Sequence, residues 1–156
     1  MNNYFLKALN QENEAPYIPV WLLRQAGRYM PEYREVRSQY KDFFEMIKKP
    51  EICKELTLQP LNAFDLDAAI TFTDILTIPD ALGLKVNFVK GKGPIFEKSL
   101  SSMDKIDLNT NEFHDKIHYV YSATSLIKEN VNVPLIGFTG SPWTLFVYMF
   151  YGQSPK

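Results

Sequence analysis

Three short apolar runs, each ending in a polar or glycine-bearing loop, constrain the fold more than any other feature of this sequence. They occupy residues 18–23, 67–73 and 133–138, and each has the length of a buried strand. Segments with helical patterns lie between and after them, so the order along the chain is strand–helix–strand–helix. This order predicts an α/β protein with a parallel sheet.

Proline positions and apolar periodicity locate the helices. Proline is favoured at the first helical position, and Pro50 and Pro142 stand at two such starts, the second after Ser141 as N-cap. A helical apolar pattern also runs through residues 111–129. The helix from Pro50 is predicted to end near Ala63, with three residues on its buried side: Ile52, Leu56 and Ala63.

Composition limits the classes of partner. The 156 residues include 17 Lys and Arg against 18 Asp and Glu, which gives a net charge of −1. Without a basic field across the whole sequence we expect no nucleic acid and no membrane partner, and any anion must bind locally. The single cysteine, Cys53, excludes an internal disulfide and is typical of a reducing compartment. We therefore expect a cytoplasmic protein, with Cys53 partly buried in its helix.

One uncharged stretch is long enough to cross a membrane. Residues 131–155 contain no charged side chain. Glycine, serine and proline interrupt this stretch between Gly137 and Pro142, where a spanning helix would break. A strand, a turn and an aromatic helix therefore explain it better than a membrane span. The N-terminus also lacks the basic start and apolar core of a signal peptide.

The loop after the first apolar run, residues 24–28, is rich in groups that bind carboxylates. Arg24 and Arg28 carry guanidinium groups, which hold carboxylates through charge-assisted and often bidentate hydrogen bonds. Between residues 24 and 37 four Arg stand against two Glu, a local charge of +2. Taken alone, these residues form either a carboxylate-binding loop or a solvated basic loop, and composition favours the second.

Asp74 follows the second apolar run and is set among apolar residues. A carboxylate in such surroundings is costly unless it is hydrogen-bonded or has a task. Its candidate tasks are to accept N–H groups from a substrate and to stabilise a cation that develops during a reaction. The alternative is a structural bond to the loop backbone or to the start of a helix.

The loop after the third run, residues 137–144, combines two glycines with aromatic residues. Its glycines allow a ligand to approach the backbone, the aromatics offer apolar walls to a flat molecule, and Tyr148 follows in the next helix. The alternative is a plain strand-to-helix turn with core aromatics. Because ligands gather at the carboxyl ends of parallel strands, we expect the three loops to form one site.

Two weaker motifs are interpreted as structural. His114 and His118 have the spacing of a zinc metalloprotease helix, but the expected Glu is an Asp, so we predict a solvated helix face. Residues 91–93 are too short for a phosphate-binding loop. They are predicted instead to turn a β-hairpin between residues 86–89 and 95–96.

Together the motifs resemble those of the uroporphyrinogen decarboxylase family. Residues 19–34 resemble its N-terminal signature, and residues 137–145 resemble its second signature. The resemblance runs from Phe5 to Pro155, essentially the whole chain. Two segments between the signatures also fit in order and spacing: residues 56–61 and 66–76.

This resemblance implies a fold and an activity. The family forms a TIM (β/α)8 barrel that removes CO2 from the four acetate side chains of uroporphyrinogen III, giving coproporphyrinogen III in haem biosynthesis. The implied reaction needs no metal and no organic cofactor. The implied partners are the tetrapyrrole substrate and, for the full-length protein, a second copy in a homodimer.

The resemblance also assigns site residues. Phe43 and Tyr148 match substrate-contacting aromatics, and Asp74 matches the acid that receives the pyrrole N–H groups. Asp74, Arg24 and Arg28 are accordingly the candidate catalytic residues. The family's substrate-binding loop corresponds to five consecutive residues: Arg24, Gln25, Ala26, Gly27 and Arg28.

Length restricts what this chain is expected to do. A complete (β/α)8 barrel needs about 250 residues, so we expect residues 1–156 to be the N-terminal portion of one barrel domain, an incomplete barrel that is inactive by itself. Further active-site residues, including a Ser or Thr and a His, are expected in a C-terminal half. Two alternatives stay open: a related-barrel methyltransferase acting on corrinoid or thiol substrates, and an inactive truncated remnant. The arginine loop argues against the methyltransferase.

Overall fold

A computed structural model describes residues 3–12, 15–89, 91–102 and 110–153, and for residues 110 and 111 the backbone alone. The chain divides into two compact units. The first unit comprises residues 1–72 and 122–138, and the second comprises residues 73–121 and 139–156. The long helix α6 (Thr110–Asn130) contributes to both.

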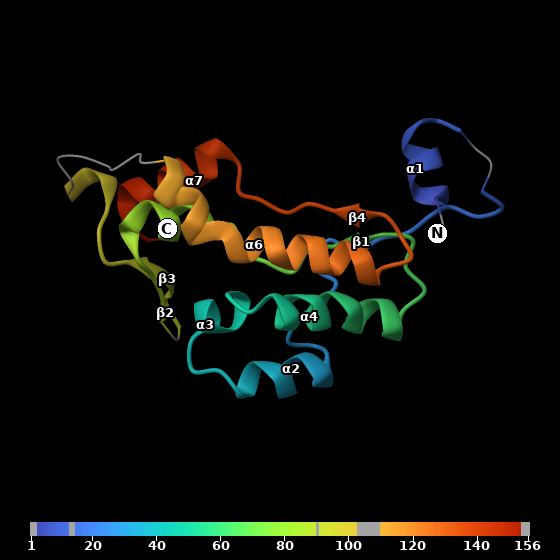
Figure 1. Cartoon of the computed structure of the whole chain (residues 1–156), viewed down its shortest axis with the longest axis horizontal. Helices are drawn as coiled ribbons and strands as arrows, with labels where there is room; N and C mark the ends of the chain where they lie inside the picture. Colours follow the sequence, from blue (N-terminus) through green and yellow to red (C-terminus); the bar gives the residue numbers. More distant parts are fainter. Residues whose placement is uncertain (1–2, 13–14, 90, 103–109, 154–156) are drawn as a thin grey trace. The chain divides into compact units, whose positions relative to one another are not determined.

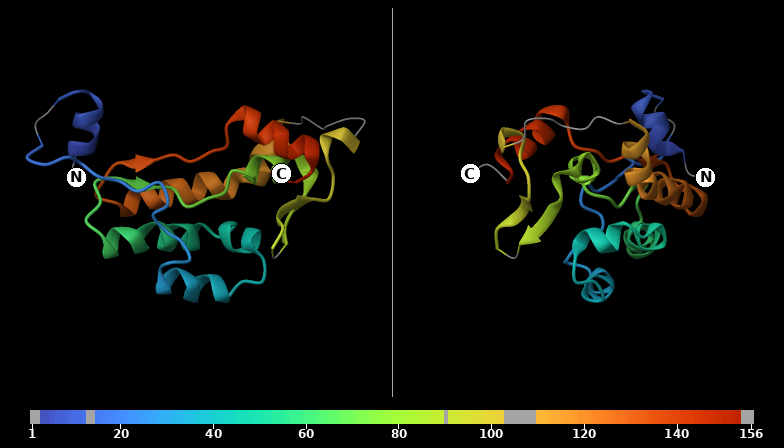
Figure 2. Two further views of the ribbon diagram at one scale, coloured as in Figure 1. Left: turned by 180° about the vertical axis from the view of Figure 1, so that it is seen from behind. Right: turned by 60° about the vertical axis from the view of Figure 1, so that its left-hand side comes forward.

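A parallel strand pair flanked by helices makes up the first unit. Strand β1 (Ala69–Ile70) pairs with β4 (Leu135–Ile136), and the two lie side by side in Figures 1 and 2. Parallel pairing of strands separated by a helix confirms the predicted α/β class. The remaining elements of this unit are the end of α6 and four helices: α1 (Tyr4–Leu9), α2 (Pro31–Ser38), α3 (Phe43–Ile47) and α4 (Pro50–Ala63).

The core of the first unit lies between these strands and the helices. Ala69 and Ile127 are completely buried there, and Val131 is nearly so. Burying a large aliphatic side chain contributes about 1.5–3 kcal/mol, so this cluster is a main source of stability. Partly buried residues from α4 and from the β4 segment pack against it: Leu58, Leu61, Val133 and Leu135.

Helix α4 confirms the predicted range but not the whole predicted face. It runs from Pro50 to Ala63, with the proline at its first position. Leu56 is buried as predicted and Ile52 is half-buried, whereas Ala63 is exposed, so its placement in the core was wrong. Ala63 is the last helical residue and extends past the packed stripe. That stripe recurs at helical spacing: Cys53, Leu56, Thr57 and Pro60.

The predicted strands are shorter than expected. Residues 18–23 form no strand, and only two residues of each later run pair as β-structure. At Val20 the backbone oxygen accepts the N–H of Asp67 (2.9 Å), but the Val20 N–H donates to the Asp67 carboxylate (2.8 Å). A side chain thus takes the place of a main-chain acceptor, so the main-chain hydrogen bonds between these two segments do not continue as a strand pair. Within the described residues the sheets are two-stranded, so the barrel is not complete.

A β-hairpin and an aromatic helix characterise the second unit. Strands β2 (Val86–Val89) and β3 (Gly93–Phe96) pair antiparallel, which confirms the predicted hairpin. Gly91 has a φ of 80° in the turn, a conformation that favours glycine. The other elements are the start of α6, α5 (Thr77–Pro79), the π-helical turn Asp80–Leu84, the 3-10 turn Leu100–Ser102 and α7 (Pro142–Tyr151).

Local capping explains the bounds of α7. The Ser141 hydroxyl accepts the N–H of Thr144 (3.3 Å), and Pro142 holds the first helical position, as predicted. Gly152 ends the helix with a φ of 70°, which an L-residue adopts only with strain. No helix among the described residues is both long enough and apolar enough to cross a membrane.

Candidate functional site

The arginine loop connects the extended segment after Val20 to helix α2. Both Arg24 and Arg28 are exposed, and among the described residues no carboxylate pairs with either guanidinium group. Backbone hydrogen bonds give the loop a defined shape, because the Met30 N–H donates to the oxygen of Gly27 (2.9 Å). Two cationic groups are therefore held on an ordered loop and remain available to an anion.

A third arginine supports this loop from helix α2. The Arg34 guanidinium donates to the backbone oxygens of Arg28 (2.7 Å) and Tyr29 (3.1 Å). The Tyr29 hydroxyl in turn donates to the backbone oxygen of Gln25. In the sequence Arg34 contributes only to the local positive charge, whereas in the structure its guanidinium group supports the loop. Its position one turn into the helix that follows the loop was the available signal.

Gln25 differs from the arginines on either side of it. Its side chain is 2% exposed. The amide nitrogen donates to the oxygen of Ala68 (2.7 Å), and the amide oxygen accepts the N–H of Ile70 (3.2 Å). Ala26 and Gly27, the other two residues of the predicted substrate loop, are half-buried. The structure thus turns Gln25 toward β1 and the two arginines toward solvent.

Phe43 lies in an aromatic cluster of the first unit. Its ring is 6.3 Å from that of Phe72 and 6.5 Å from that of Phe44, both centroid to centroid. Tyr33 joins the cluster at 5.9 Å from Phe72. Burial raises the pKa of the Tyr33 phenol, and the positive charges of Arg37 and Arg28 partly oppose this rise. The positive charge of Arg28 therefore acts on Tyr33, which belongs to the same aromatic cluster as Phe43.

Asp74 makes the structural bond that the sequence offered as its alternative interpretation, and one of its carboxylate oxygens is left over. One carboxylate oxygen accepts the Leu76 N–H (2.8 Å), which is a structural bond to the loop backbone. The other, Oδ2, has no hydrogen-bond donor among the described residues and can accept one from a ligand. Burial raises the pKa of Asp74, and the Leu76 N–H partly lowers it. The side chain is half-buried and belongs to the second unit.

The glycine–aromatic loop does not have the core aromatics of its alternative interpretation. A Cβ at Gly140 would meet the Leu145 side chain at 2.6 Å, so close packing accounts for this glycine. Trp143 is 73% exposed and stacks on Phe146 (5.8 Å between centroids), and Phe146 continues the row to Phe150 (5.7 Å). These aromatics therefore form an outer face of α7 and not a core. Tyr148 is half-buried on the same helix.

The candidate residues divide between the two units. Residues 24–28 and Phe43 belong to the first unit, and Asp74 and Tyr148 to the second. Within the first unit, hydrogen bonds and ring contacts place the loop and the aromatic cluster around the segment from Ala68 to Phe72.

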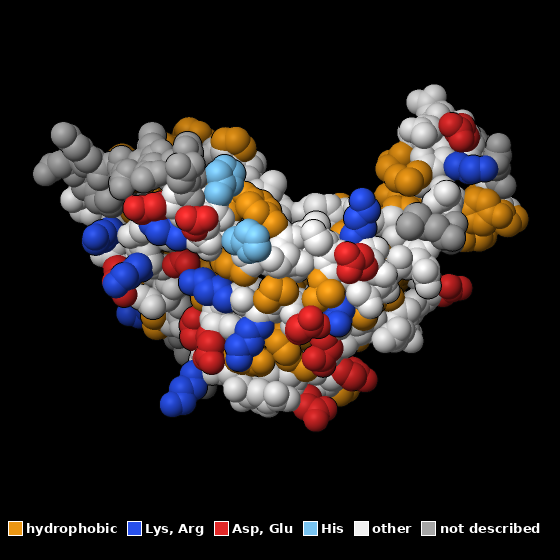
Figure 3. All heavy atoms as spheres, in the orientation of Figure 1, with side chains coloured by type: hydrophobic (Ala, Val, Ile, Leu, Met, Phe, Trp, Pro, Cys, Tyr) orange, Lys and Arg blue, Asp and Glu red, His pale blue; other side chains and the backbone are white. Residues whose placement is uncertain are grey.

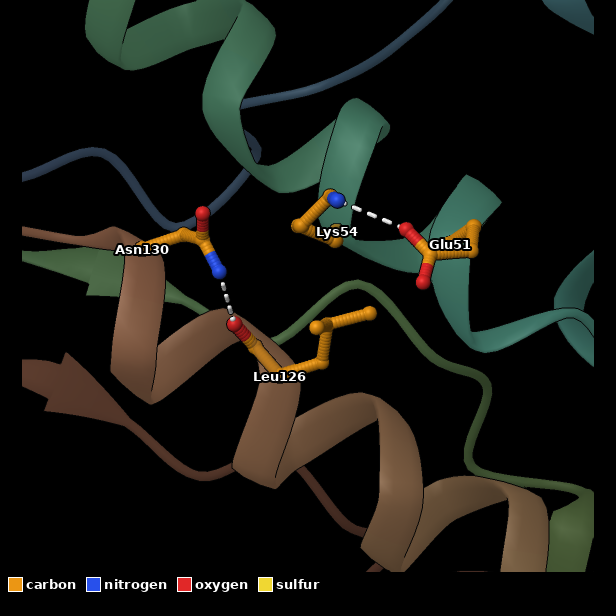
Figure 4. Close-up of polar contacts among 4 residues, drawn as sticks. All are labelled: Glu51, Lys54, Leu126 and Asn130. Carbon is orange, nitrogen blue, oxygen red and sulfur yellow. Dashed lines mark hydrogen bonds and ion pairs between the residues drawn. The ribbon is translucent and has the colours of Figure 1, made fainter.

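A second surface of the first unit has the opposite charge. Acidic side chains gather over α2 and α4 in Figure 3. A groove of about 680 Å³ between these helices is lined by Glu32, Glu35, Glu51 and Glu55, with Lys54 among them. Lys54 pairs with Glu51 at 2.6 Å, while Asn130 donates to the oxygen of Leu126 at the end of α6 (Figure 4). Carboxylates repel an anionic ligand, so this groove does not suit one.

The weaker motifs have the structural roles predicted for them. His114 and His118 are exposed on α6, and the Nδ1 of His114 lies 2.8 Å from the Tyr121 hydroxyl. The described residues include no group of three His, Cys, Asp or Glu side chains arranged to hold a metal ion. Cys53 is buried, and burial raises the pKa of its thiol to about 12.

A solved structure with a related fold supports the partial barrel. A methyltransferase from Methanosarcina mazei superposes with a TM-score of 0.63 at 20% identity, covering 92% of this chain and 43% of its own. At that identity the likeness concerns the fold alone. Together with the parallel pairing of β1 and β4, it indicates a partial TIM-barrel fold.

The sequence comparisons are more specific. The family model described as uroporphyrinogen decarboxylase (URO-D) matches residues 1–156. The uroporphyrinogen decarboxylase of Francisella tularensis subsp. novicida is 46% identical over 159 residues, which is 100% of this chain and 46% of that protein. The enzyme of Vibrio campbellii is 49% identical over 160 residues, 99% of this chain and 44% of its own. This chain thus spans about half the length of these relatives. Since the match extends over every residue and includes the arginine loop, the chain belongs to the uroporphyrinogen decarboxylase family.

Proposed function

We propose that the protein containing this sequence is a carboxy-lyase that converts uroporphyrinogen III to coproporphyrinogen III by removing four carboxyl groups as CO2. The observation that carries the proposal is the pair of exposed guanidinium groups, unpaired with any described carboxylate, on the ordered loop of a family member. A polycarboxylate substrate supplies the anions that such a loop lacks.

Arg24 and Arg28 are proposed to bind the substrate carboxylates. A guanidinium group donates two parallel hydrogen bonds to a carboxylate, which fixes direction as well as charge. The loop takes its shape from a backbone hydrogen bond and from Arg34, so the backbone that carries the two arginines need not be ordered when substrate arrives. Pre-ordering of this kind reduces the entropic cost of binding.

Asp74 is proposed to accept pyrrole N–H groups through the carboxylate oxygen that Leu76 does not use. In the proposed reaction a proton adds to the ring carbon beside the acetate, which places positive charge on the pyrrole. The C–C bonding pair then moves into the ring as CO2 leaves. A proton adds to the resulting methylene and the ring carbon loses its own, so one acetate and one proton give one methyl group and CO2. A fixed carboxylate stabilises the cation along this path.

The chemistry requires neither an oxidant nor a reductant, because it exchanges a carboxylate for a proton. We therefore propose a reaction without metal or organic cofactor, with Phe43 and Tyr148 as apolar contacts to the macrocycle. We also propose a homodimer of the full-length protein and a cytoplasmic location, as for the family. Identity of 46–49% to decarboxylases favours this activity over that of a related-barrel methyltransferase.

The test uses the protein encoded by the complete reading frame that contains this sequence. It is incubated without oxygen with uroporphyrinogen III, and the products are oxidised to porphyrins and separated by carboxyl number. We expect porphyrins with seven, six, five and four carboxyl groups to appear in turn. Arg24→Ala and Arg28→Ala should each lower kcat/KM by about tenfold or more, whereas Lys116→Ala on α6 should leave it unchanged. Folded wild-type protein that releases no CO2 would refute the proposal.

A further inference from the structure

Gln25 lies inside the arginine loop, but its side chain faces away from solvent. The resemblance to the family places it with Arg24 and Arg28 as a substrate residue. Its side chain is 2% exposed, and both ends of its amide are already hydrogen-bonded, to Ala68 and to Ile70. A substrate contact would have to break these bonds, and leaving a buried polar group unpaired costs about 1–3 kcal/mol.

The two bonds have the pattern of a parallel strand. In a parallel ladder a residue donates its N–H to the oxygen of one neighbour and accepts the N–H of the residue two positions further on. The Gln25 amide does the same with the oxygen of Ala68 and the N–H of Ile70. The opposite edge of this strand pairs with β4, through the N–H of Ala69 on the oxygen of Pro134 (2.9 Å). The carboxamide therefore occupies the edge of β1 that β4 leaves open.

We propose that Gln25 is a positioning residue, whose carboxamide replaces a strand residue on the open edge of β1 and so fixes the direction in which Arg24 and Arg28 project. The chain before the loop is held separately, by the contacts between Val20 and Asp67. The chain after it is held by Arg34. Gln25 is the point between them where the loop itself is tied to the strand. This role rests on the proposed function only for the identity of the ligand that the arginines bind.

Gln25→Glu tests the role through pH. A protonated Glu has the donor and the acceptor of Gln, since its O–H can donate to Ala68 while its carbonyl accepts from Ile70. An ionised Glu has no donor and places negative charge against the Ala68 oxygen. Because burial raises the pKa of a carboxyl group, the variant should retain the loop in acid and lose it as the side chain ionises.

Two measurements on the full-length protein separate this role from substrate contact. The first is hydrogen exchange of the Ile70 amide from about pH 5 to about pH 8, corrected for the intrinsic pH dependence of exchange. We expect protection in the wild type throughout, and in Gln25→Glu only at the acidic end. The second is kcat/KM for uroporphyrinogen III, which should match the wild type at the acidic end and fall by about tenfold or more at the basic end.

Matched variants complete the design. Gln25→Met keeps the size of the side chain but neither hydrogen bond, so it should be impaired at every pH. Gln39→Glu makes the same chemical change at an exposed position and should follow the wild type.

Wild-type Ile70 without protection would overturn the inference, and that measurement needs no variant to fold. Equal pH profiles for Gln25→Glu and wild type would also overturn it, as would a fall in kcat/KM with Ile70 still protected, which indicates a substrate contact. Inactive wild type with a protected Ile70 would refute the proposed function and leave this role supported.

Discussion

Asp67→Ala is the change that most directly tests how the chain before the arginine loop is held. Asp67 is 5% exposed, and its carboxylate accepts two hydrogen bonds from a segment nearly fifty residues away. One comes from the Tyr17 hydroxyl (2.6 Å) and the other from the Val20 N–H (2.8 Å). Alanine removes both acceptors and leaves the backbone bond from the Asp67 N–H to Val20 in place.

The two bonds differ in what their loss costs. Hydrogen bonds to charged groups contribute about 1.5–3 kcal/mol, and the bond from the Val20 N–H to the buried Asp67 carboxylate is of this kind. Tyr17 is 47% exposed, so its hydroxyl regains water, and its bond contributes about 0.5–1 kcal/mol. Removing the carboxylate also removes the cost of burying it. We therefore expect Asp67→Ala to lower the free energy of unfolding by about 2–3 kcal/mol, and Tyr17→Phe by less than half of that.

Equilibrium unfolding in urea, followed by far-UV circular dichroism and by tryptophan fluorescence, measures both changes. With a slope of about 1–3 kcal/mol per molar urea, Asp67→Ala should shift the midpoint by about 1–2 M. Asp67→Asn keeps one oxygen for Val20 and should lie between Asp67→Ala and wild type. The reasoning is wrong if Asp67→Ala unfolds within about 0.3 M of wild type, or if Tyr17→Phe costs as much as Asp67→Ala.

Three further predictions follow from burial. Burial raises the pKa of Asp74, so the folded chain binds this proton more tightly than the unfolded chain, and stability is lost as the pH rises above the ordinary value of 3.8. Asp74→Asn should therefore raise the urea midpoint of unfolding above that of wild type at pH 7 but not in acid. An equal gain at both pH values would contradict this prediction. A pKa of about 12 lowers the thiolate fraction of Cys53 at about pH 8 by about a thousandfold. A disulfide reagent should therefore label this thiol only at the rate at which the protein unfolds. Rapid labelling of the native protein would show that the thiol is exposed. Ile127 is fully buried, so Ile127→Ala should cost about 2–5 kcal/mol and Ile127→Val about 1 kcal/mol in urea unfolding, and equal effects would show that the site collapses around the cavity.

Much of the local structure was predictable from residues close together in the sequence. Prolines marked the starts of α4 and α7, and the hairpin of β2 and β3 followed from a glycine-rich turn between apolar runs. These signals act through steric limits on φ and through missing N–H groups, which depend on the residue itself and its neighbours. The family motifs were equally visible, and the match of the family model to residues 1–156 confirms the family.

The orientation of the site residues was less predictable. Arg24, Gln25 and Arg28 are polar residues of one five-residue loop, and nothing in their order distinguishes the buried amide from the exposed cations. The aromatics of α7 were expected in a core or against a ligand, and the largely exposed Trp143 does not lie in a core. The two glycines of the third loop were expected to admit a ligand, and at Gly140 the close approach of Leu145 is a second reason for a glycine. In each case the deciding neighbour depends on how elements pack and not on composition.

The sequence alone determined the family, the positions of α4, α6 and α7 and the charge of the loop, because these depend on residue type and local spacing. Tertiary structure decided which polar groups are used inside the protein and which stay available to a ligand. The Asp67 carboxylate accepts the N–H of Val20 in the first apolar run, and the Gln25 amide hydrogen-bonds to the open edge of β1. Both choices join groups more than forty residues apart, and a buried polar group must find its partner wherever the fold brings one. The run predicted as a strand is for this reason held by side chains, and the two arginines are left facing solvent.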